Sequence, residues 1–309
     1  MRHIIDPGQE RRSINFIDNI CYSRVKDLEG RPLDLHLSLM AQNGNSEMRL
    51  ASGADDEVST GRQPLIVWIN GAGWRGCDKN LMAAEMEFLA EAGYAVACIY
   101  YRSSAEGHFP DQLIDCKTAV RFLRAHADEY GIDPDHVGTI GRSAGGHLSA
   151  WMAMNTDGCD TEEWGDQPST VQAAVDMFGP VDIRRCNEIE VERFKDPSHR
   201  WHSLGETHGG ALLGGDEATM LERSDAASPI FSMSEEMCPI TILHGDQDPL
   251  VSVEISEDFY RRIVEAGFED RADLYIVKNG GHGTRELFQP MTKQVILNFF
   301  DKHLKGTAK

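Results

Sequence analysis

The sequence predicts an α/β protein with a mostly parallel central sheet of about eight strands, and three observations lead to that prediction. Short apolar runs alternate with longer stretches whose apolar residues recur every three or four positions. From residue 64 onward the strand-like runs are continuously apolar, which is typical of parallel strands buried on both faces. A chain of 309 residues can form one such domain with a large core. We therefore expect residues 1–309 to form a single domain, with helices flanking the sheet.

The first two expected strands, residues 20–25 and 33–39, are predicted to form a hairpin or an edge pair. Apolar and polar residues alternate strictly in the second of them, which indicates one buried face and one wetter face. His36 is then an outward-facing strand residue. Residues 41–63 are rich in Gly, Ser, Asn and Asp and show no periodicity, so we expect a surface insertion there.

The parallel part of the sheet follows, with crossover helices between its strands. Strands are expected at residues 64–69, 94–100, 136–141, 173–178, 239–243 and 274–277. Helices are expected at residues 81–92, 112–130, 254–266 and 286–304. This alternation of strands and helices predicts a three-layer α/β domain.

Residues 181–229 interrupt the alternation. The segment is polar, contains several histidines, and shows only a short helical pattern around residues 217–223. A long excursion at the carboxyl end of a central strand is where substrate-binding segments of such domains occur. We expect a cap or a substrate loop in this segment.

Charge and hydropathy exclude several classes of partner. The formal net charge is −20, with no run of Lys or Arg, so nucleic acids and anionic membrane surfaces should be repelled. For the same reason we expect highly anionic substrates to be disfavoured, by an effect that weakens as salt is added. No segment has eighteen uninterrupted apolar residues, and the first ten residues lack the apolar stretch of a signal peptide. We expect a cytoplasmic protein that interacts with no membrane.

The most informative motif is the pentapeptide Gly141-Arg142-Ser143-Ala144-Gly145. A β-branched run precedes it and a stretch of helical composition follows, which is the order of a nucleophile elbow. A serine between glycines can also simply allow a helix to pack close to a strand. A nucleophilic serine needs a base, an acid that orients the base, and donors for the oxyanion. Asp246 and Asp248 follow one expected strand, and His282 follows the last one among glycines, so the order Ser, Asp, His fits this architecture.

From about residue 63 onward the chain resembles the α/β-hydrolase esterases. Within them it is similar to the bacterial branch that includes hormone-sensitive-lipase-like carboxylesterases and feruloyl or acetyl-xylan esterases. Four motifs carry the resemblance: the glycine-rich loop Asn70-Gly71-Ala72-Gly73-Trp74-Arg75-Gly76, the pair Tyr101-Arg102, the stretch Phe109-Pro110-Asp111-Gln112-Leu113-Ile114-Asp115, and Ser143-Ala144-Gly145-Gly146-His147-Leu148. The chain departs from the family pattern where Asn70 replaces a usual His, Ala72 a usual Gly, and Tyr100 a frequent Asp.

The resemblance implies a role for each site residue. Ser143 would be the nucleophile, His282 the general base, and Asp248 the acid that orients His282. Asp246 would then be a turn or cap residue. The oxyanion would be held by backbone N–H groups of Ala72, Gly73 and Ala144, and Trp74 would form part of the substrate-binding wall or pack in the core.

No metal or cofactor is expected. The spacing of His199, His202 and His208 fits no zinc motif. The glycine-rich loop lacks the Lys-Ser/Thr pair of a phosphate-binding loop, and no dinucleotide fingerprint is present. His147 is expected to pack or to cap rather than to react.

The resulting hypothesis is a serine carboxylesterase that hydrolyses short-chain esters through an acyl-enzyme, with small-molecule or saccharide esters as substrates. Acetylated or feruloylated saccharides fit this class. Two alternatives keep the same fold. One is an amide or peptide hydrolase of the arylformamidase or prolyl-oligopeptidase type, and the other is a hydrolase fold used only for binding.

Overall fold

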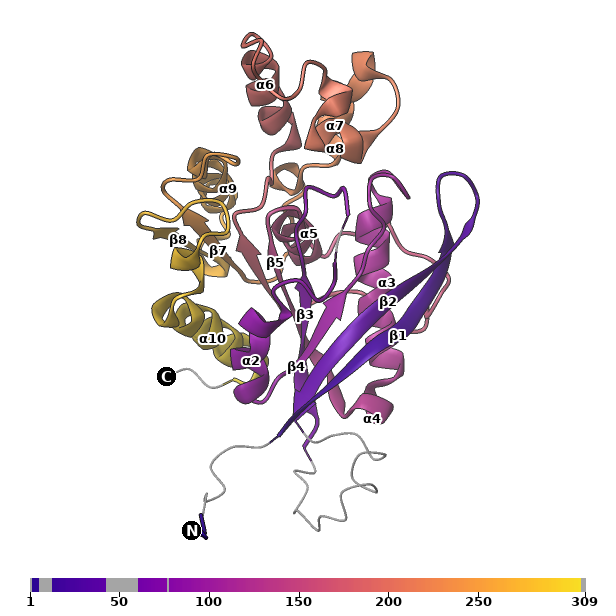
Figure 1. The fold of residues 1–309 in the computed structure, drawn as a ribbon, viewed down its shortest axis with the longest axis vertical. Helices are drawn as coiled ribbons and strands as arrows, with labels where there is room; N and C mark the ends of the chain where they lie inside the picture. The colour runs from indigo at the N-terminus through magenta and orange to yellow at the C-terminus, as the bar shows by residue number, and fades with distance from the viewer. Residues whose placement is uncertain (1, 6–12, 43–60, 77, 307–309) are drawn as a thin grey trace.

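In the computed structural model, which describes residues 2–5, 13–42, 61–76 and 78–306, eight strands form one sheet (Figure 1). The spatial order is β1-β2-β4-β3-β5-β6-β7-β8. The β1–β2 and β2–β4 pairs are antiparallel, and every other neighbouring pair is parallel. The strands are β1 (Ile14–Lys26), β2 (Pro32–Gln42), β3 (Gln63–Ile69), β4 (Ala95–Ile99), β5 (Ile132–Arg142), β6 (Ala173–Met177), β7 (Ile240–Gly245) and β8 (Ala272–Val277). The predicted strands and the mostly parallel sheet are confirmed.

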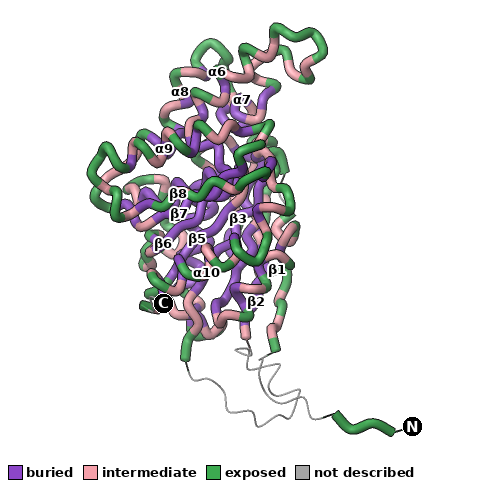
Figure 2. Tube along the Cα trace, turned by 90° about the vertical axis from the view of Figure 1, so that its left-hand side faces the viewer, coloured by how far each residue is buried: buried purple, intermediate pink, exposed green. Residues whose placement is uncertain are grey.

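Alternate residues of the central strands pack against different helix layers. Leu65, Val67 and Ile69 of β3 belong to a cluster with apolar residues of α3 (Asp111–Ala125), α5 (Ala144–Ala153) and α9 (Val253–Glu265). Ile66 and Trp68 belong to the other cluster, with residues of α2 (Glu87–Glu91) and α10 (Pro290–Leu304). Because successive strand side chains point to opposite faces, continuous apolar strands require helices on both sides. The buried residues of the central strands therefore run through the middle of the molecule (Figure 2).

Three of the four predicted helices are divided in ways that apolar spacing does not reveal. The prediction for residues 81–92 covers a 3₁₀ turn (Ala83–Met86) and the short helix α2, and Met82, which takes a left-handed φ of 64°, precedes both. The prediction for residues 112–130 covers α3 and α4 (Ala127–Tyr130), which separate at His126. The prediction for residues 286–304 covers a 3₁₀ turn (Arg285–Phe288) and α10, which begins at Pro290 because proline is accepted in a first helical turn but not in an interior one.

Residues 181–229 are more helical than their composition predicts. They contain α6 (Ile183–Arg193), α7 (His208–Leu213) and α8 (Met220–Ala226), which lie together at one end of the molecule in Figure 1. Helical structure is found near residues 217–223, where it was expected, but the expectation that it is the only helical part of the segment is wrong. Most residues of α6 are charged, so its apolar face is narrow. The Asp182 carboxylate caps the helix by accepting from the Arg185 N–H at 2.8 Å.

The predicted surface insertion at residues 41–63 falls mainly outside the described residues, which omit 43–60. Its two ends are described. Gln42 closes β2 and Gln63 opens β3, and the side chain of Gln63 donates to the Gln42 carbonyl at 3.0 Å and accepts from the Gln42 N–H at 3.0 Å. In the part of the chain that the structure describes, no helix has the length and apolar character needed to cross a membrane.

Asp176 on β6 leads to a prediction about stability and pH. Its side chain is fully buried, and this burial raises the pKa of its carboxyl to about 6, although the Gly179 N–H and the neighbouring His244 act in the opposite direction. A pKa that is higher in the folded than in the unfolded state contributes stability at low pH, and this contribution is lost as the pH rises from about 4 to about 6.

Asp176→Asn should remove this pH dependence because an amide does not ionise in this range. The amide oxygen can still accept from the Gly179 N–H, which lies 2.8 Å from Oδ1. Calorimetry should show that the melting temperature of the variant minus that of the parent is higher at pH 7.5 than at pH 4.5. Asp166→Asn at an exposed site is the matched control. A relative melting temperature that does not change with pH would contradict the assignment.

Candidate active site

Ser143 occupies the tight turn between β5 and α5, so the predicted order of strand, turn and helix is confirmed. Its φ of 53° and ψ of −123° are strained for a residue with a side chain. The flanking glycines are required sterically. A β-carbon at Gly141 would lie 2.0 Å from the Gly145 carbonyl oxygen, and one at Gly145 would lie 1.8 Å from the Ile69 carbonyl oxygen. The turn holds the Ser143 side chain at the carboxyl edge of the sheet.

The structure brings together three side chains that are distant in sequence. Ser143 Oγ lies 2.8 Å from His282 Nε2, and His282 Nδ1 lies 2.8 Å from Asp248 Oδ2. They meet because β5, β7 and β8 run parallel and end at the same edge of the sheet. Phe178, at the end of β6, contacts the His282 ring edge-on with ring centroids 4.9 Å apart.

Asp248 is held by more groups than sequence reasoning found. Its buried carboxylate also lies 3.3 Å from His244 Nε2 and accepts from the N–H groups of Leu250 and Val251 at 2.8 and 3.0 Å. Burial alone raises the pKa of Asp248, but the hydrogen bonds from His244 and His282 outweigh burial and bring the pKa well below its ordinary range. Asp248 is therefore an anion at neutral pH. The polar His244 at the end of an apolar strand was the available signal for this extra contact.

Asp246 lies elsewhere in the same turn. Its Oδ1 accepts from the Asn279 N–H at 2.7 Å, which joins the loop after β7 to the loop after β8. The side chain is exposed and does not contact His282. Of the two carboxylates in this turn, Asp248, which the family resemblance implied as the acid, is the one that geometry places beside the imidazole.

The glycine-rich loop after β3 is joined to the elbow through Asn70. The buried Asn70 side chain accepts from Arg142 Nε at 2.8 Å and donates to the Asp78 carbonyl at 3.0 Å. The Tyr101 hydroxyl donates to the Asn70 carbonyl at 2.9 Å. Asn70, which replaces the family's usual histidine, therefore connects the start of the loop to the residue before Ser143.

The residues predicted to form an oxyanion hole line the same pocket as Ser143 and His282. Ala72 and Gly73 approach from the glycine-rich loop, and Ala144 approaches from α5. Ala144 is the first residue of α5, where a backbone N–H has no partner within the helix. The arrangement can offer N–H groups from two segments to an oxygen bound at Ser143.

The pocket has a volume of about 410 Å³. One side is formed by the loops at the sheet edge. The other side is formed by residues of the 181–229 segment, which include Asn187, Glu190, Arg193, His199, Arg200, Trp201 and His208. Sequence reasoning placed a substrate segment there but identified none of these side chains as pocket residues.

Trp74 forms part of one wall of this pocket, and His147 packs behind it in the core. Trp74 lines the pocket and is 3% exposed, and its ring meets His147 edge-on at 5.1 Å. His147 is fully buried, and its Nε2 lies 2.7 Å from the Ala227 carbonyl. Burial lowers the pKa of His147 to about 4, so the ring is neutral and donates this hydrogen bond. His147 connects α5 to the end of the 181–229 segment and does not line the pocket.

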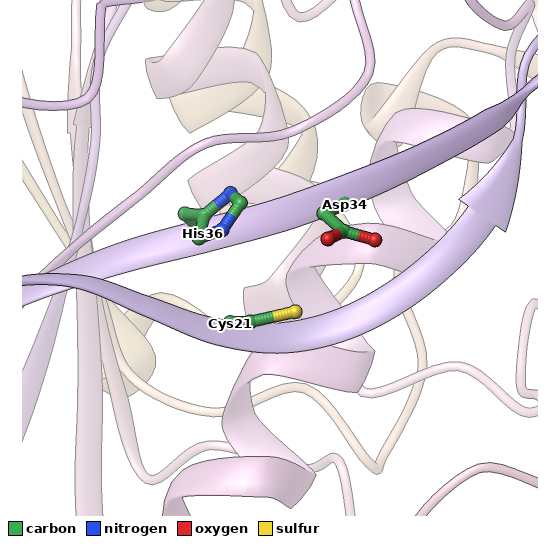
Figure 3. A group of neighbouring side chains, drawn as sticks. All are labelled: Cys21, Asp34 and His36. Atoms are coloured by element: carbon green, nitrogen blue, oxygen red, sulfur yellow. The ribbon is translucent and has the colours of Figure 1, made fainter.

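One group of possible metal ligands lies outside the pocket. Cys21, Asp34 and His36 place sulfur, oxygen and nitrogen atoms within 4.8 Å of one another across β1 and β2 (Figure 3). Cys21 and His36 are directly opposed in the strand register. Asp34 is ion-paired with Arg24 at 3.4 Å, and the Cys21 thiol donates to the Ser23 carbonyl at 3.6 Å. These contacts account for two of the three side chains without a metal.

Comparison with known proteins identifies the family. The BD-FAE family model matches residues 55–263, which is more than half of the chain. The chain belongs to the BD-FAE family. The match covers the glycine-rich loop, the Ser143 turn and Asp248, whereas His282 lies beyond its end.

Curated relatives of this BD-FAE chain include two proteins of Mycobacterium tuberculosis. The chain is 34% identical over 202 residues to a probable carboxylic ester hydrolase, LipM, covering 65% of this chain and 44% of the relative. It is 27% identical over 208 residues to the esterase LipQ, covering 67% of this chain and 47% of the relative. The chain thus spans about half the length of the curated relatives it matches.

Solved structures show the same fold. A truncated carbohydrate esterase from gut microbiota superimposes with a TM-score of 0.75 at 25% identity, covering 97% of this chain and 99% of that one. Esterase 2 of Thermogutta terrifontis, in a form phosphorylated by paraoxon, superimposes with a TM-score of 0.67 at 22% identity over the whole of both chains. The predicted α/β-hydrolase fold is confirmed.

Proposed function

We propose that this protein is a serine-dependent carboxylic ester hydrolase that acts on short-chain esters through an acyl-enzyme. The observation that carries the proposal is the pair of 2.8 Å contacts that links Asp248 to His282 and His282 to Ser143. The names of the curated relatives and the similarity to a carbohydrate esterase support ester hydrolysis. Acetylated or feruloylated saccharides are the substrates that we propose.

In the proposed reaction, Ser143 Oγ attacks the ester carbonyl carbon while His282 Nε2 takes the hydroxyl proton. Collapse of the tetrahedral intermediate expels the alcohol, which leaves with that proton, and the acyl group stays on Ser143. Water then attacks the acyl carbon, His282 takes the water proton and returns it to Ser143 Oγ, and the acid leaves. Asp248, as an anion, keeps the Nδ1 proton on His282 and stabilises the imidazolium.

The negative charge on the carbonyl oxygen would be held by backbone N–H groups of Ala72, Gly73 and Ala144. These residues line the pocket with Ser143, which supports this assignment.

We also propose that residues 181–229 act as a cap within a single domain, with Trp74 on the opposite wall. The pocket residues that the segment contributes support the assignment, and they are the groups that would contact the substrate.

The test of this function is a series of 4-nitrophenyl esters of increasing acyl length. We expect kcat/KM to be highest from acetyl to butyryl and to fall steeply beyond about eight carbons, because pocket size limits the acyl group. The pocket volume is about 410 Å³, Ala72 adds a methyl group to the oxyanion loop, and the opposite wall carries polar and charged side chains beside apolar ones. An optimum at long chains, or activation at a lipid interface, would contradict the proposal. Release of acetate or ferulate from a series of different acylated saccharides then shows which acyl group is removed and which saccharide is accepted as the alcohol part.

A further inference from the structure

The pocket wall contributed by the 181–229 segment carries a positive charge that no carboxylate neutralises. Arg200 lines the pocket, and its guanidinium carbon lies 3.6 Å from the centre of the Trp201 ring. Within the described ranges of the chain, Arg200 forms no ion pair, and its one polar neighbour is His208, at 3.4 Å. Arg193, on the same wall, is by contrast paired with Glu190 at 2.5 Å.

His208 lies between this arginine and a second one. Arg75, from the glycine-rich loop, approaches His208 Nδ1 with its Nε at 3.2 Å, while Arg200 Nη2 approaches Nε2. The terminal nitrogen of Arg75 donates to the Glu206 and Thr207 carbonyls, the latter at 2.9 Å. Two guanidinium groups therefore face the two nitrogens of one imidazole ring.

The His208 ring offers these two arginines too few hydrogen-bond acceptors. Burial, followed by the charges of Arg75 and Arg200, lowers the pKa of His208 to about 4, so the ring is neutral at pH 7. A neutral imidazole has one acceptor nitrogen and one N–H group, and a guanidinium has only donors. This one acceptor nitrogen can satisfy a single arginine N–H, and the other N–H groups of Arg200 have no acceptor among the described residues. An anionic oxygen in the pocket would accept from these Arg200 N–H groups.

We propose that the natural ester carries an ionised carboxylate that binds Arg200 beside His208 while its ester carbonyl reaches Ser143. This rests on the proposed function and adds a substrate class: hemiesters of dicarboxylic acids, or acylated hydroxy acids and sugar acids. A planar carboxylate matches the guanidinium fork, and the Trp201 ring holds Arg200 in position for it.

The net charge of −20 does not oppose this binding once the substrate has arrived. Charges on distant faces act across solvent and are screened beyond about 10 Å in 0.1 M salt. The guanidinium of Arg200, in contrast, would be in direct contact with the carboxylate. The expectation that anionic substrates are disfavoured holds for approach from solution, whereas the pocket wall favours a single carboxylate at contact distance.

The test compares two matched pairs of esters. In the acyl pair, the 4-nitrophenyl hemiester of adipic acid is compared with its methyl ester. In the alcohol pair, 4-carboxyphenyl acetate is compared with 4-carbamoylphenyl acetate. We expect the acidic member of one pair to have the higher kcat/KM by about tenfold, a typical effect of one charge-assisted hydrogen bond. The pair that responds shows whether the carboxylate belongs to the acyl or the alcohol side.

Arg200→Gln should bring the acidic-to-neutral ratio close to one, and Arg75→Gln should reduce it less. Added salt should also reduce it. The matched control is Arg185→Gln, on the exposed side of α6, where Arg185 pairs with Glu188 at 3.6 Å. The control should keep both the ratio and the basal activity. A parent ratio at or below one in both pairs, or a ratio that Arg200→Gln leaves unchanged, would overturn the inference.

A binding measurement separates this inference from the proposed function. Titration calorimetry of the Ser143→Ala variant with 4-carboxyphenyl acetate and 4-carbamoylphenyl acetate, and with the adipate pair, needs no turnover. Preference for the acidic member of a pair, lost when Arg200→Gln is added, supports the carboxylate site whether or not the parent hydrolyses esters. Equal binding of both members in both pairs refutes it even if the parent is an active esterase.

Discussion

Ser143→Ala should lower the turnover of an aryl acetate by about 10⁴ or more while the fold stays intact. The hydroxyl oxygen is the atom that would form the covalent bond to the acyl group, and the other groups of the pocket cannot replace it. Ser143 Oγ is the serine oxygen that lies 2.8 Å from His282 Nε2. The measurement is steady-state hydrolysis of phenyl acetate, with circular dichroism and the melting temperature as checks on folding.

The control for the serine variant is Ser149→Ala on the same helix. The Ser149 hydroxyl is buried against Thr139 at 2.9 Å and does not face the pocket, so its loss should affect stability more than turnover. A mass shift after reaction with an organophosphate probe should appear in the parent and in Ser149→Ala, and not in Ser143→Ala. If Ser143→Ala kept activity within tenfold of the parent, the acyl-enzyme mechanism would be wrong.

The second large effect is expected at Asp248. Asp248→Asn should reduce turnover by about 10³ to 10⁴, because an amide cannot both hold the His282 Nδ1 proton and stabilise the imidazolium. The carboxylate is buried with two histidines around it, and the hydrogen bonds of His244 and His282 keep the pKa of Asp248 well below its ordinary range. The same substitution at Asp246 should cost far less, since an amide oxygen can still accept from the Asn279 N–H.

The comparison of the two asparagine variants is itself the control. Both substitutions are isosteric and lie two residues apart in one turn, so general damage to the turn would affect both. Melting temperatures separate lost activity from lost folding. A larger loss at Asp246 than at Asp248 would show that the acid had been assigned to the wrong carboxylate.

The strands were predictable because their signal is local. Parallel strands buried on both faces must be continuously apolar, and residues 64–69 or 173–178 satisfy this without reference to the rest of the chain. The Ser143 turn was predictable for a similar reason, since glycines at 141 and 145 are needed wherever a helix backbone comes this close to a strand. Helix ends were less predictable. The helical start after Met82 and the break at His126 depend on single backbone conformations that apolar spacing does not encode.

The sequence by itself determined the sheet, the elbow and the loops in which Asp248 and His282 lie, because chain order and parallel strands bring these loops to one edge. The family resemblance implied Asp248 as the acid, but only the tertiary structure gives the physical reason: the two carboxylates are chemically alike, and the Asp248 side chain points to His282 while the Asp246 side chain points to the Asn279 N–H. The tertiary structure also decided what surrounds the pocket. Arg75 and His208 are far apart in sequence and meet through packing between two loops, and no local pattern records such a contact.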